Sequence, residues 1–137
     1  MPANTSPIFP LTPNIGSPFN TILTANTAVD GTGTVATCYT AGTNGGFIDS
    51  VEFRHLGTNV ATVARIFVNN GSTNATATNN QLIGEVTVGA NTLSQTAASI
   101  PYTIQLKKNV PSGYKINITI GTTVATGILP IVYAMDY

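Results

Sequence analysis

The amino-acid sequence predicts an all-β protein. We expect a single antiparallel β-sandwich or jelly-roll-like domain of about eight short strands, preceded by an extended, proline-rich N-terminal arm. β-Branched Thr and Val dominate most of the chain, and these residues suit a pleated surface. Short segments of this kind recur between turns rich in Gly, Asn and Pro. No window shows the i, i+3, i+4, i+7 apolar spacing of an amphipathic helix.

The predicted arm covers residues 1–20, and the sandwich covers residues 21–137. Five of the eight prolines fall within the arm. Proline removes a backbone donor and favours extended conformations before it, so the arm can be neither a helix nor a central strand. The arm also carries the apolar residues Ile8, Phe9, Leu11, Ile15 and Phe19. These indicate an arm that lies on a surface, either its own sandwich or a neighbouring subunit.

Eight strands are expected after the arm, over 21–28, 34–39, 47–56, 60–68, 81–88, 99–106, 114–120 and 128–133. Residues 69–80 are expected to form a polar loop, because they include no apolar residue larger than Ala.

Two hairpins are predicted within this set. In the C-terminal one, Leu106 lies opposite Tyr114 and Ile100 opposite Ile120, so that both apolar rows share one face. Its tip gathers Lys107, Lys108 and Lys115. These lysines either prevent edge pairing and keep the tip solvated, or dock on an acidic partner.

The other predicted hairpin joins 47–56 to 60–68, with Val51 opposite Ala64. One face is expected to be core and to carry Val51, Phe53, His55, Val60, Ala64, Ile66 and Val68. The other face would carry Ile48, Glu52, Arg54, Val63, Arg65 and Phe67, with Glu52 and Arg65 as a surface ion pair. An exposed apolar cluster beside arginine is typical of a contact surface, although the arm could instead cover it.

The sequence contains no pattern typical of catalysis, and we expect neither enzymatic activity nor a cofactor or metal. Cys38 is the only thiol and His55 the only imidazole, and nothing in the sequence places them together. Charged residues make up 7% of the chain and the net charge is zero, so nucleic acid is not an expected partner. The longest apolar run, from Ile128 to Met135, is shorter than the ~20 residues of a membrane helix. The first residues do not resemble a signal peptide, which favours synthesis in the cytoplasm.

Several segments resemble small virion proteins of tailed phages. They include Ser-Pro-Ile-Phe at 6–9, Thr-Pro-Asn-Ile-Gly at 12–16, Ala-Arg-Ile-Phe-Val at 64–68, Val-Pro-Ser-Gly-Tyr at 110–114 and the final Asp-Tyr, together with 23–27 and 30–33. Over nearly its whole length the chain is similar to capsid decoration, or cement, proteins.

The resemblance implies a non-enzymatic β-sandwich that binds the outer surface of a finished capsid shell in the virion. The implied partners are the major capsid protein and further copies of the chain, as a dimer or trimer. The expected contact residues are Ile8, Phe9, Leu11, Ile15, Phe19, Ile48, Val63, Arg65, Phe67, Lys107, Lys108 and Lys115. The alternative is a tail, neck or head-fibre module, with Tyr39, Tyr133 and Tyr137 as candidates for glycan binding.

Overall fold

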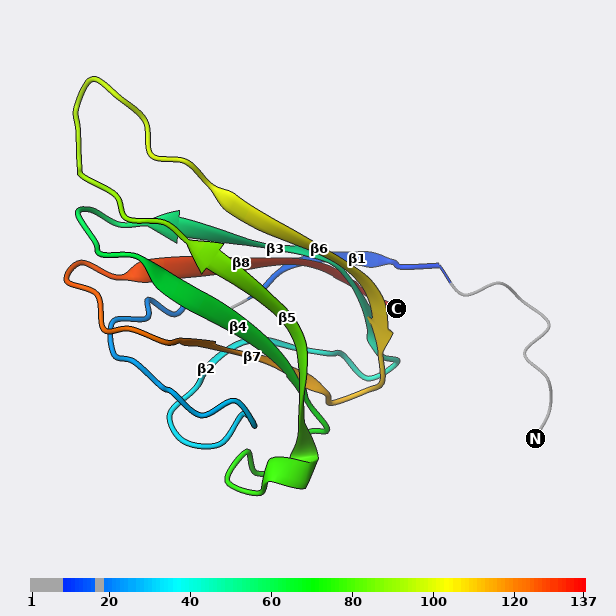
Figure 1. Ribbon diagram of the computed structural model, residues 1–137. Coiled ribbons are helices and arrows are strands. Elements are labelled where there is room, and N and C mark those ends of the chain that lie inside the picture. The colour runs from blue at the N-terminus through cyan, green and yellow to red at the C-terminus, as the bar shows by residue number, and fades with distance from the viewer. Residues whose placement is uncertain (1–8, 17–18) are drawn as a thin grey trace, which may run out of the picture.

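The computed structural model describes residues 9–16 and 19–137, and over these it confirms the predicted all-β sandwich. Two antiparallel four-stranded sheets pack face to face (Figure 1). Sheet A contains, in spatial order, β1 (Thr12–Ile15), β8 (Ile128–Asp136), β3 (Gly46–His55) and β6 (Tyr102–Val110). Sheet B contains β2 (Ala36–Thr40), β7 (Lys115–Ile120), β4 (Thr62–Asn69) and β5 (Asn80–Val88). A short 3₁₀ turn, η1 (Ala77–Asn79), precedes β5.

Consecutive strands rarely share a sheet in this fold. Only β4 and β5 are neighbours both in sequence and in one sheet, and every other connection crosses from one sheet to the other. Eight strands in this double-sheet order form a jelly roll. Most strand pairing therefore joins segments that are far apart in the sequence.

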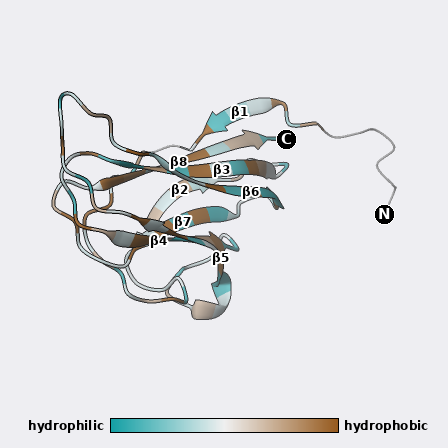
Figure 2. Cartoon of the chain, turned by 45° about the horizontal axis from the view of Figure 1, so that its top comes forward, coloured by the Kyte–Doolittle hydropathy of each residue, from teal (hydrophilic) through white to brown (hydrophobic). Residues whose placement is uncertain are grey.

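The core lies between the two sheets and follows from the alternation of side chains along each strand. Ile116, Ile118 and Ile120 of β7 are fully buried, as are Val51 and Phe53 of β3. Burial of each large apolar side chain contributes roughly 1.5–3 kcal/mol. Figure 2 shows hydrophobic residues on the central strands β8, β7 and β4.

Seven of the expected strands are present, but the prediction of a strand over 21–28 is wrong. That segment makes only an isolated bridge between Ile22 and Ile128 beside sheet A. It then crosses to sheet B, where the Asn26 amide donates to the Ile120 carbonyl. The eighth strand is instead β1, which lies within the expected arm and occupies the edge of sheet A.

Both predicted hairpins are wrong. β6 pairs with β3, and β7 pairs with β2 and β4, so Ile104 lies opposite Val51 and Ile116 lies opposite Val68. β3 and β4 lie in different sheets. The predicted apolar rows do face the core along β6 and β7, except for Ile100, which precedes β6 and is 69% exposed. The alternation of apolar and polar residues predicts which face of a strand is buried, but it does not predict the pairing partner. The next strand in sequence shows the same alternation whether it pairs in a hairpin or lies in the opposite sheet.

Candidate docking surfaces

Part of the expected arm is a strand of the sandwich, and large apolar side chains on and near this strand stand in solvent. β1 runs antiparallel to β8, with Thr12 opposite Asp136 and Ile15 opposite Tyr133. The exposed fractions are 66% for Phe9, 78% for Leu11, 53% for Ile15 and 57% for Phe19. Ile8 lies outside the described residues. We call Phe9, Leu11, Ile15 and Phe19 the arm surface.

The carboxylate of Asp136 attaches β1 to the body of the protein. It accepts hydrogen bonds from Asn14 Nδ2 at 2.9 Å, the Tyr39 hydroxyl at 2.5 Å and the Gly42 amide at 3.3 Å. Burial alone would raise the pKa of Asp136, but these hydrogen bonds outweigh it and hold the pKa below its usual value. Burial, and then donation to this carboxylate, raise the pKa of Tyr39. Asp136 therefore links β1 to β2, in addition to the backbone pairing of β1 with β8.

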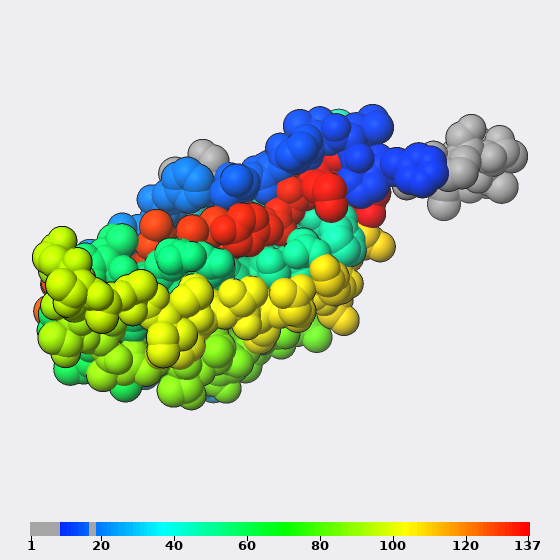
Figure 3. Space-filling model, turned by 90° about the horizontal axis from the view of Figure 1, so that it is seen from above, coloured from blue at the N-terminus to red at the C-terminus, as the bar shows by residue number. Residues whose placement is uncertain are grey.

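The outer face of sheet A, which points away from the core, carries a row of apolar side chains on β8. Along β8 the outward residues are Leu129, Ile131, Tyr133 and Met135, and all are half-buried. Register places Ile15 beside Tyr133, while Pro13 and Phe47 flank Met135. Figure 3 looks onto this face and shows the bands of β1, β8, β3 and β6 side by side with nothing lying across them. We call Leu129, Ile131, Tyr133, Met135 and Phe47 the sheet A face.

Sequence reasoning missed the sheet A face, although a signal was present. The run from Ile128 to Met135 is apolar without interruption, so β8 has apolar residues on both of its faces. Continuous apolar strands are typical of sheets covered on both sides. The strand predicted over 128–133 carried no expectation about its outer face.

The predicted exposed cluster of Ile48, Val63 and Phe67 is wrong. A bulge between Ile48 and Ser50 shifts the register of β3, so that Ile48 points into the core and is fully buried. Ile48 and Phe67 also lie in different sheets, and Val63 is half-buried.

Phe67 does point away from the core, as predicted, yet its side chain is fully buried. It lies opposite Asn117, which is 2% exposed, on the outer face of sheet B. The segment 26–34 crosses this side of the molecule and is fixed at both ends (Figure 1). The Asn26 amide donates to Ile120, and Asn74 Nδ2 donates to the carbonyls of Gly31 and Gly33. These bonds hold the connection 26–34 beside β7 and the loop before β5, at sheet B.

The predicted lysine cluster is not at a hairpin tip. Lys107 and Lys108 belong to β6 in sheet A, whereas Lys115 begins β7 in sheet B. Lys107 forms an ion pair with Asp49. The predicted pair of Glu52 with Arg65 is also wrong, because Arg54 binds Glu52 at 2.5 Å and Arg65 binds Glu85 at 3.0 Å.

Cys38 and His55 are each held by structural contacts. Burial raises the pKa of the Cys38 thiol to about 12, and its Sγ lies 3.4 Å from the Ala36 carbonyl oxygen. The ring nitrogens of His55 lie 2.8 Å from the Gly89 carbonyl oxygen and 3.2 Å from Asn59 Nδ2. Within 9–16 and 19–137, no three His, Cys, Asp or Glu side chains gather as metal ligands would.

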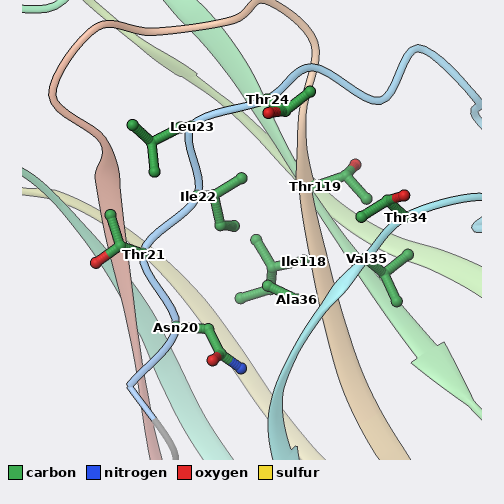
Figure 4. A pocket seen from close by; sticks show the side chains of 10 residues that line it. All are labelled: Asn20, Thr21, Ile22, Leu23, Thr24, Thr34, Val35, Ala36, Ile118 and Thr119. Carbon is green, nitrogen blue, oxygen red and sulfur yellow. The ribbon is translucent and has the colours of Figure 1, made fainter.

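A hollow opens at the side of the sandwich, between the segment 20–24 and the start of β2 (Figure 4). Ile22, Ala36 and Ile118 contribute apolar side chains to it, and threonines and Asn20 add polar groups. Asn20 Nδ2 donates to the Thr37 carbonyl at 2.7 Å and so bridges the two sides. No charged residue lines this hollow.

The three tyrosines considered for glycan binding lie in different environments. Tyr39 is 1% exposed, so its ring offers no surface to a sugar. Tyr133 is part of the sheet A face, and the Tyr137 hydroxyl donates to Asn109 Oδ1 at 2.6 Å.

Comparisons of the chain with protein-family models, with curated proteins and with solved structures found no match. Over the part of the chain that the structure describes, no helix has the length and apolar character needed to cross a membrane.

Proposed function

We propose that this chain is a non-enzymatic structural protein of a tailed-phage virion, which decorates the capsid and stabilises it by binding across subunits of the major capsid protein. The observation that carries the proposal is the arm surface, where four large apolar side chains stand in solvent: Ile15 on β1, which pairs with β8, and Phe9, Leu11 and Phe19 close to it in the sequence. The partner, the major capsid protein, is proposed from the resemblance of the sequence to decoration proteins.

The arm surface suits attachment to a larger assembly. Burial of each of its side chains would contribute roughly 1.5–3 kcal/mol before the costs of association. Because a shell repeats its subunits, many modest contacts of this kind add up by avidity. A protein that binds the assembled shell more tightly than free subunits stabilises the shell by mass action.

The charge distribution supports contacts that depend little on salt. Arg54, Arg65 and Lys107 are already paired with carboxylates of the same chain, and the net charge is zero. Attachment would therefore rest on apolar burial, which ionic screening does not weaken.

Co-sedimentation with capsid shells tests the proposal. Shells of a tailed phage that encodes this chain, prepared without it, are mixed with the protein, and unassembled major capsid protein is assayed in parallel. We expect binding to shells but little binding to free subunits. A double variant, Leu11→Ser with Phe19→Ser, should bind shells at least about tenfold more weakly, as expected from the loss of two apolar anchors.

Leu93→Ser is the matched control, because Leu93 is 60% exposed and lies in the β5–β6 loop, far along the sequence from the arm. It should bind shells like the unsubstituted protein. Absence of binding, equal binding to free subunits, or equal loss in both variants would contradict the proposal. Electron microscopy of the particles would show a tail, neck or fibre location if the alternative holds.

A further inference from the structure

The only histidine of the chain lies where three connections meet at one end of the sandwich. His55 is the last residue of β3 and is 8% exposed. The connections are 56–61 between β3 and β4, 89–101 between β5 and β6, and 121–127 between β7 and β8. Figure 1 shows 89–101 as a long loop that extends beyond the strands on either side of it. Asn59 and Asn91 join the first two connections through a pair of backbone hydrogen bonds of 3.0 and 2.9 Å.

The hydrogen bonds of Asn59 fix which atom of its side-chain amide faces His55. Its Oδ1 accepts from the backbone amide of Thr126 at 2.8 Å. A backbone amide can only donate, so the oxygen of Asn59 must face Thr126 and the nitrogen must lie on the other side. This Nδ2 donates to the Gly127 carbonyl at 2.9 Å and lies 3.2 Å from His55 Nδ1. Because a side-chain amide nitrogen can also only donate, His55 Nδ1 must be the acceptor and carry no proton.

The second ring nitrogen of His55 has the opposite requirement. Nε2 lies 2.8 Å from the carbonyl oxygen of Gly89, which can only accept, so Nε2 carries a proton. One form of the ring satisfies both contacts, the neutral imidazole protonated at Nε2. A second proton, at Nδ1, would face the Nδ2 hydrogens of Asn59 and break that hydrogen bond. Turning the Asn59 amide over would only transfer the conflict to the Thr126 amide, which is also a donor.

The surroundings of His55 supply no charge that would compensate for an imidazolium. The three connections contain no Asp, Glu, Lys or Arg, and the nearby ends of β4, β5 and β8 are also uncharged. β6 contributes Tyr102, whose ring lies edge-on to His55 with the ring centroids 6.1 Å apart. The neighbouring Arg54 lies on the opposite face of β3 and pairs with Glu52. Among residues 9–16 and 19–137, no carboxylate forms an ion pair with His55, so protonation would break one hydrogen bond without forming another.

We infer that His55 and Asn59 form an acid-sensitive latch for the loop 89–101. With a neutral ring, His55 binds the loop at Gly89 and holds Asn59, whose backbone binds Asn91. Uptake of a proton from solvent at Nδ1 breaks the bond between His55 and Asn59 and loosens the loop. An imidazole ordinarily titrates between pH 5 and 8, where carboxyl, lysine and arginine side chains keep their charge, so one proton on one side chain operates the latch. The inference is independent of capsid binding, which was assigned to the arm surface.

Two NMR measurements on the unsubstituted protein test the inference. The ring-nitrogen chemical shifts of the single imidazole should show the neutral form protonated at Nε2 at about pH 7.5 and the doubly protonated form at about pH 5.5. Amide exchange, corrected for its intrinsic dependence on pH, should then lose about tenfold in protection at Asn91 and Leu93, the equivalent of one buried hydrogen bond. These two amides donate to the Asn59 carbonyl and to Thr58 Oγ1. The amide of Ile66, in the central strand pair of sheet B, should keep its protection.

His55→Phe is the variant that cannot take up the proton. Its ring can still pack edge-on against Tyr102 but makes neither polar contact, so the two loop amides should have low protection at both pH values. Tyr102→Phe is the control, because it removes the other titratable group at this site and should keep the pH dependence of the unsubstituted protein. Circular dichroism establishes that each protein is folded at each pH.

Four results would overturn the inference. They are a ring protonated at Nδ1 at neutral pH, a ring that stays neutral at about pH 5.5, loop protection that does not change when the ring is protonated, and a pH dependence that persists in His55→Phe or is lost in Tyr102→Phe.

Discussion

At the scale of single residues, Asn59 connects three loops at one end of the sandwich. Its Nδ2 donates to the Gly127 carbonyl at 2.9 Å, and its Oδ1 accepts from the backbone amide and hydroxyl of Thr126 at 2.8 and 2.9 Å. The same Nδ2 lies 3.2 Å from His55, whose other ring nitrogen contacts Gly89. Asn59 is 4% exposed, so water cannot readily replace it as a partner.

Asn59→Ala is expected to lower the free energy of unfolding by about 2–4 kcal/mol, because it removes three hydrogen bonds that a buried side chain makes to Thr126 and Gly127. Urea unfolding at a fixed protein concentration measures the loss. The control is Asn70→Ala, which removes two side-chain hydrogen bonds, one donated to Asn79 and one accepted from Ser72, at an exposed site. Water can replace those bonds, so its cost should stay below about 1 kcal/mol. Equal losses of unfolding free energy in the two variants would show that the burial of the Asn59 hydrogen bonds does not determine their contribution to stability.

At the scale of elements, β1 combines weak pairing with a strong electrostatic attachment. It is a four-residue edge strand containing Pro13, and it is bonded on one side only, to β8. The hydrogen bonds of Asn14 and Tyr39 to Asp136 compensate for this short pairing. Part of the attachment of β1 to the body therefore depends on the ionisation of the Asp136 carboxyl group.

Asp136→Asn is expected to lower the free energy of unfolding by about 1–2 kcal/mol at pH 6, because hydrogen bonds to a charged acceptor are stronger than those to an amide. The pKa of Asp136 is lowered in the folded protein, so the ionised group stabilises the fold above its usual pKa of 3.8. That contribution is lost as the pH falls through the folded-state value. The difference between the two proteins should therefore shrink toward zero as the pH is lowered to about 2.

Urea unfolding of both proteins from pH 6 downward measures this difference. Hydrogen bonds from Thr32 and Lys107 also lower the pKa values of Asp30 and Asp49, respectively. Both carboxyl groups are present in the two proteins, so their contributions cancel in the difference in unfolding free energy. Amide exchange at Leu11 and Gly16 should accelerate in the variant, because these amides join the β1 segment to β8. A difference in stability that stays constant with pH would contradict this role of Asp136.

The strands also show which features of the fold could be predicted from the sequence and which could not. Seven strands and the polar loop over 69–80 were predicted, since both depend on local composition and alternation. The orientation of Ile48 was not, because the bulge beside it shifts the face by one residue. β1 was not predicted either, since its pairing is supplied by β8, more than a hundred residues away.

At the scale of the whole molecule, the jelly-roll order makes nearly all strand pairing non-local. β1 pairs with β8, β2 with β7 and β3 with both β6 and β8, and only β4 and β5 form a local hairpin. Each non-local pair requires a long loop to close before its contacts form, which slows folding.

Refolding is therefore expected on the scale of milliseconds to seconds, as for other all-β sandwiches. Stopped-flow dilution from urea measures it, after a brief unfolding pulse that is too short for the eight prolines to isomerise. Folding in less than a millisecond would contradict a mechanism limited by non-local pairing.

The sequence by itself determined the β class, the position of most strands and the nearly uncharged character of the surface. These follow from composition and from a side-chain period of two, which are local properties of the chain. Only the tertiary structure decided which strands pair, that Phe67 is buried on the outer face of sheet B, and that Leu129, Ile131, Tyr133 and Met135 on the outer face of β8 are only half-buried. The physical reason is that the alternation of apolar and polar residues is local and indicates which face of a strand packs on the core. The exposure of the opposite face depends instead on where segments distant in the sequence pack.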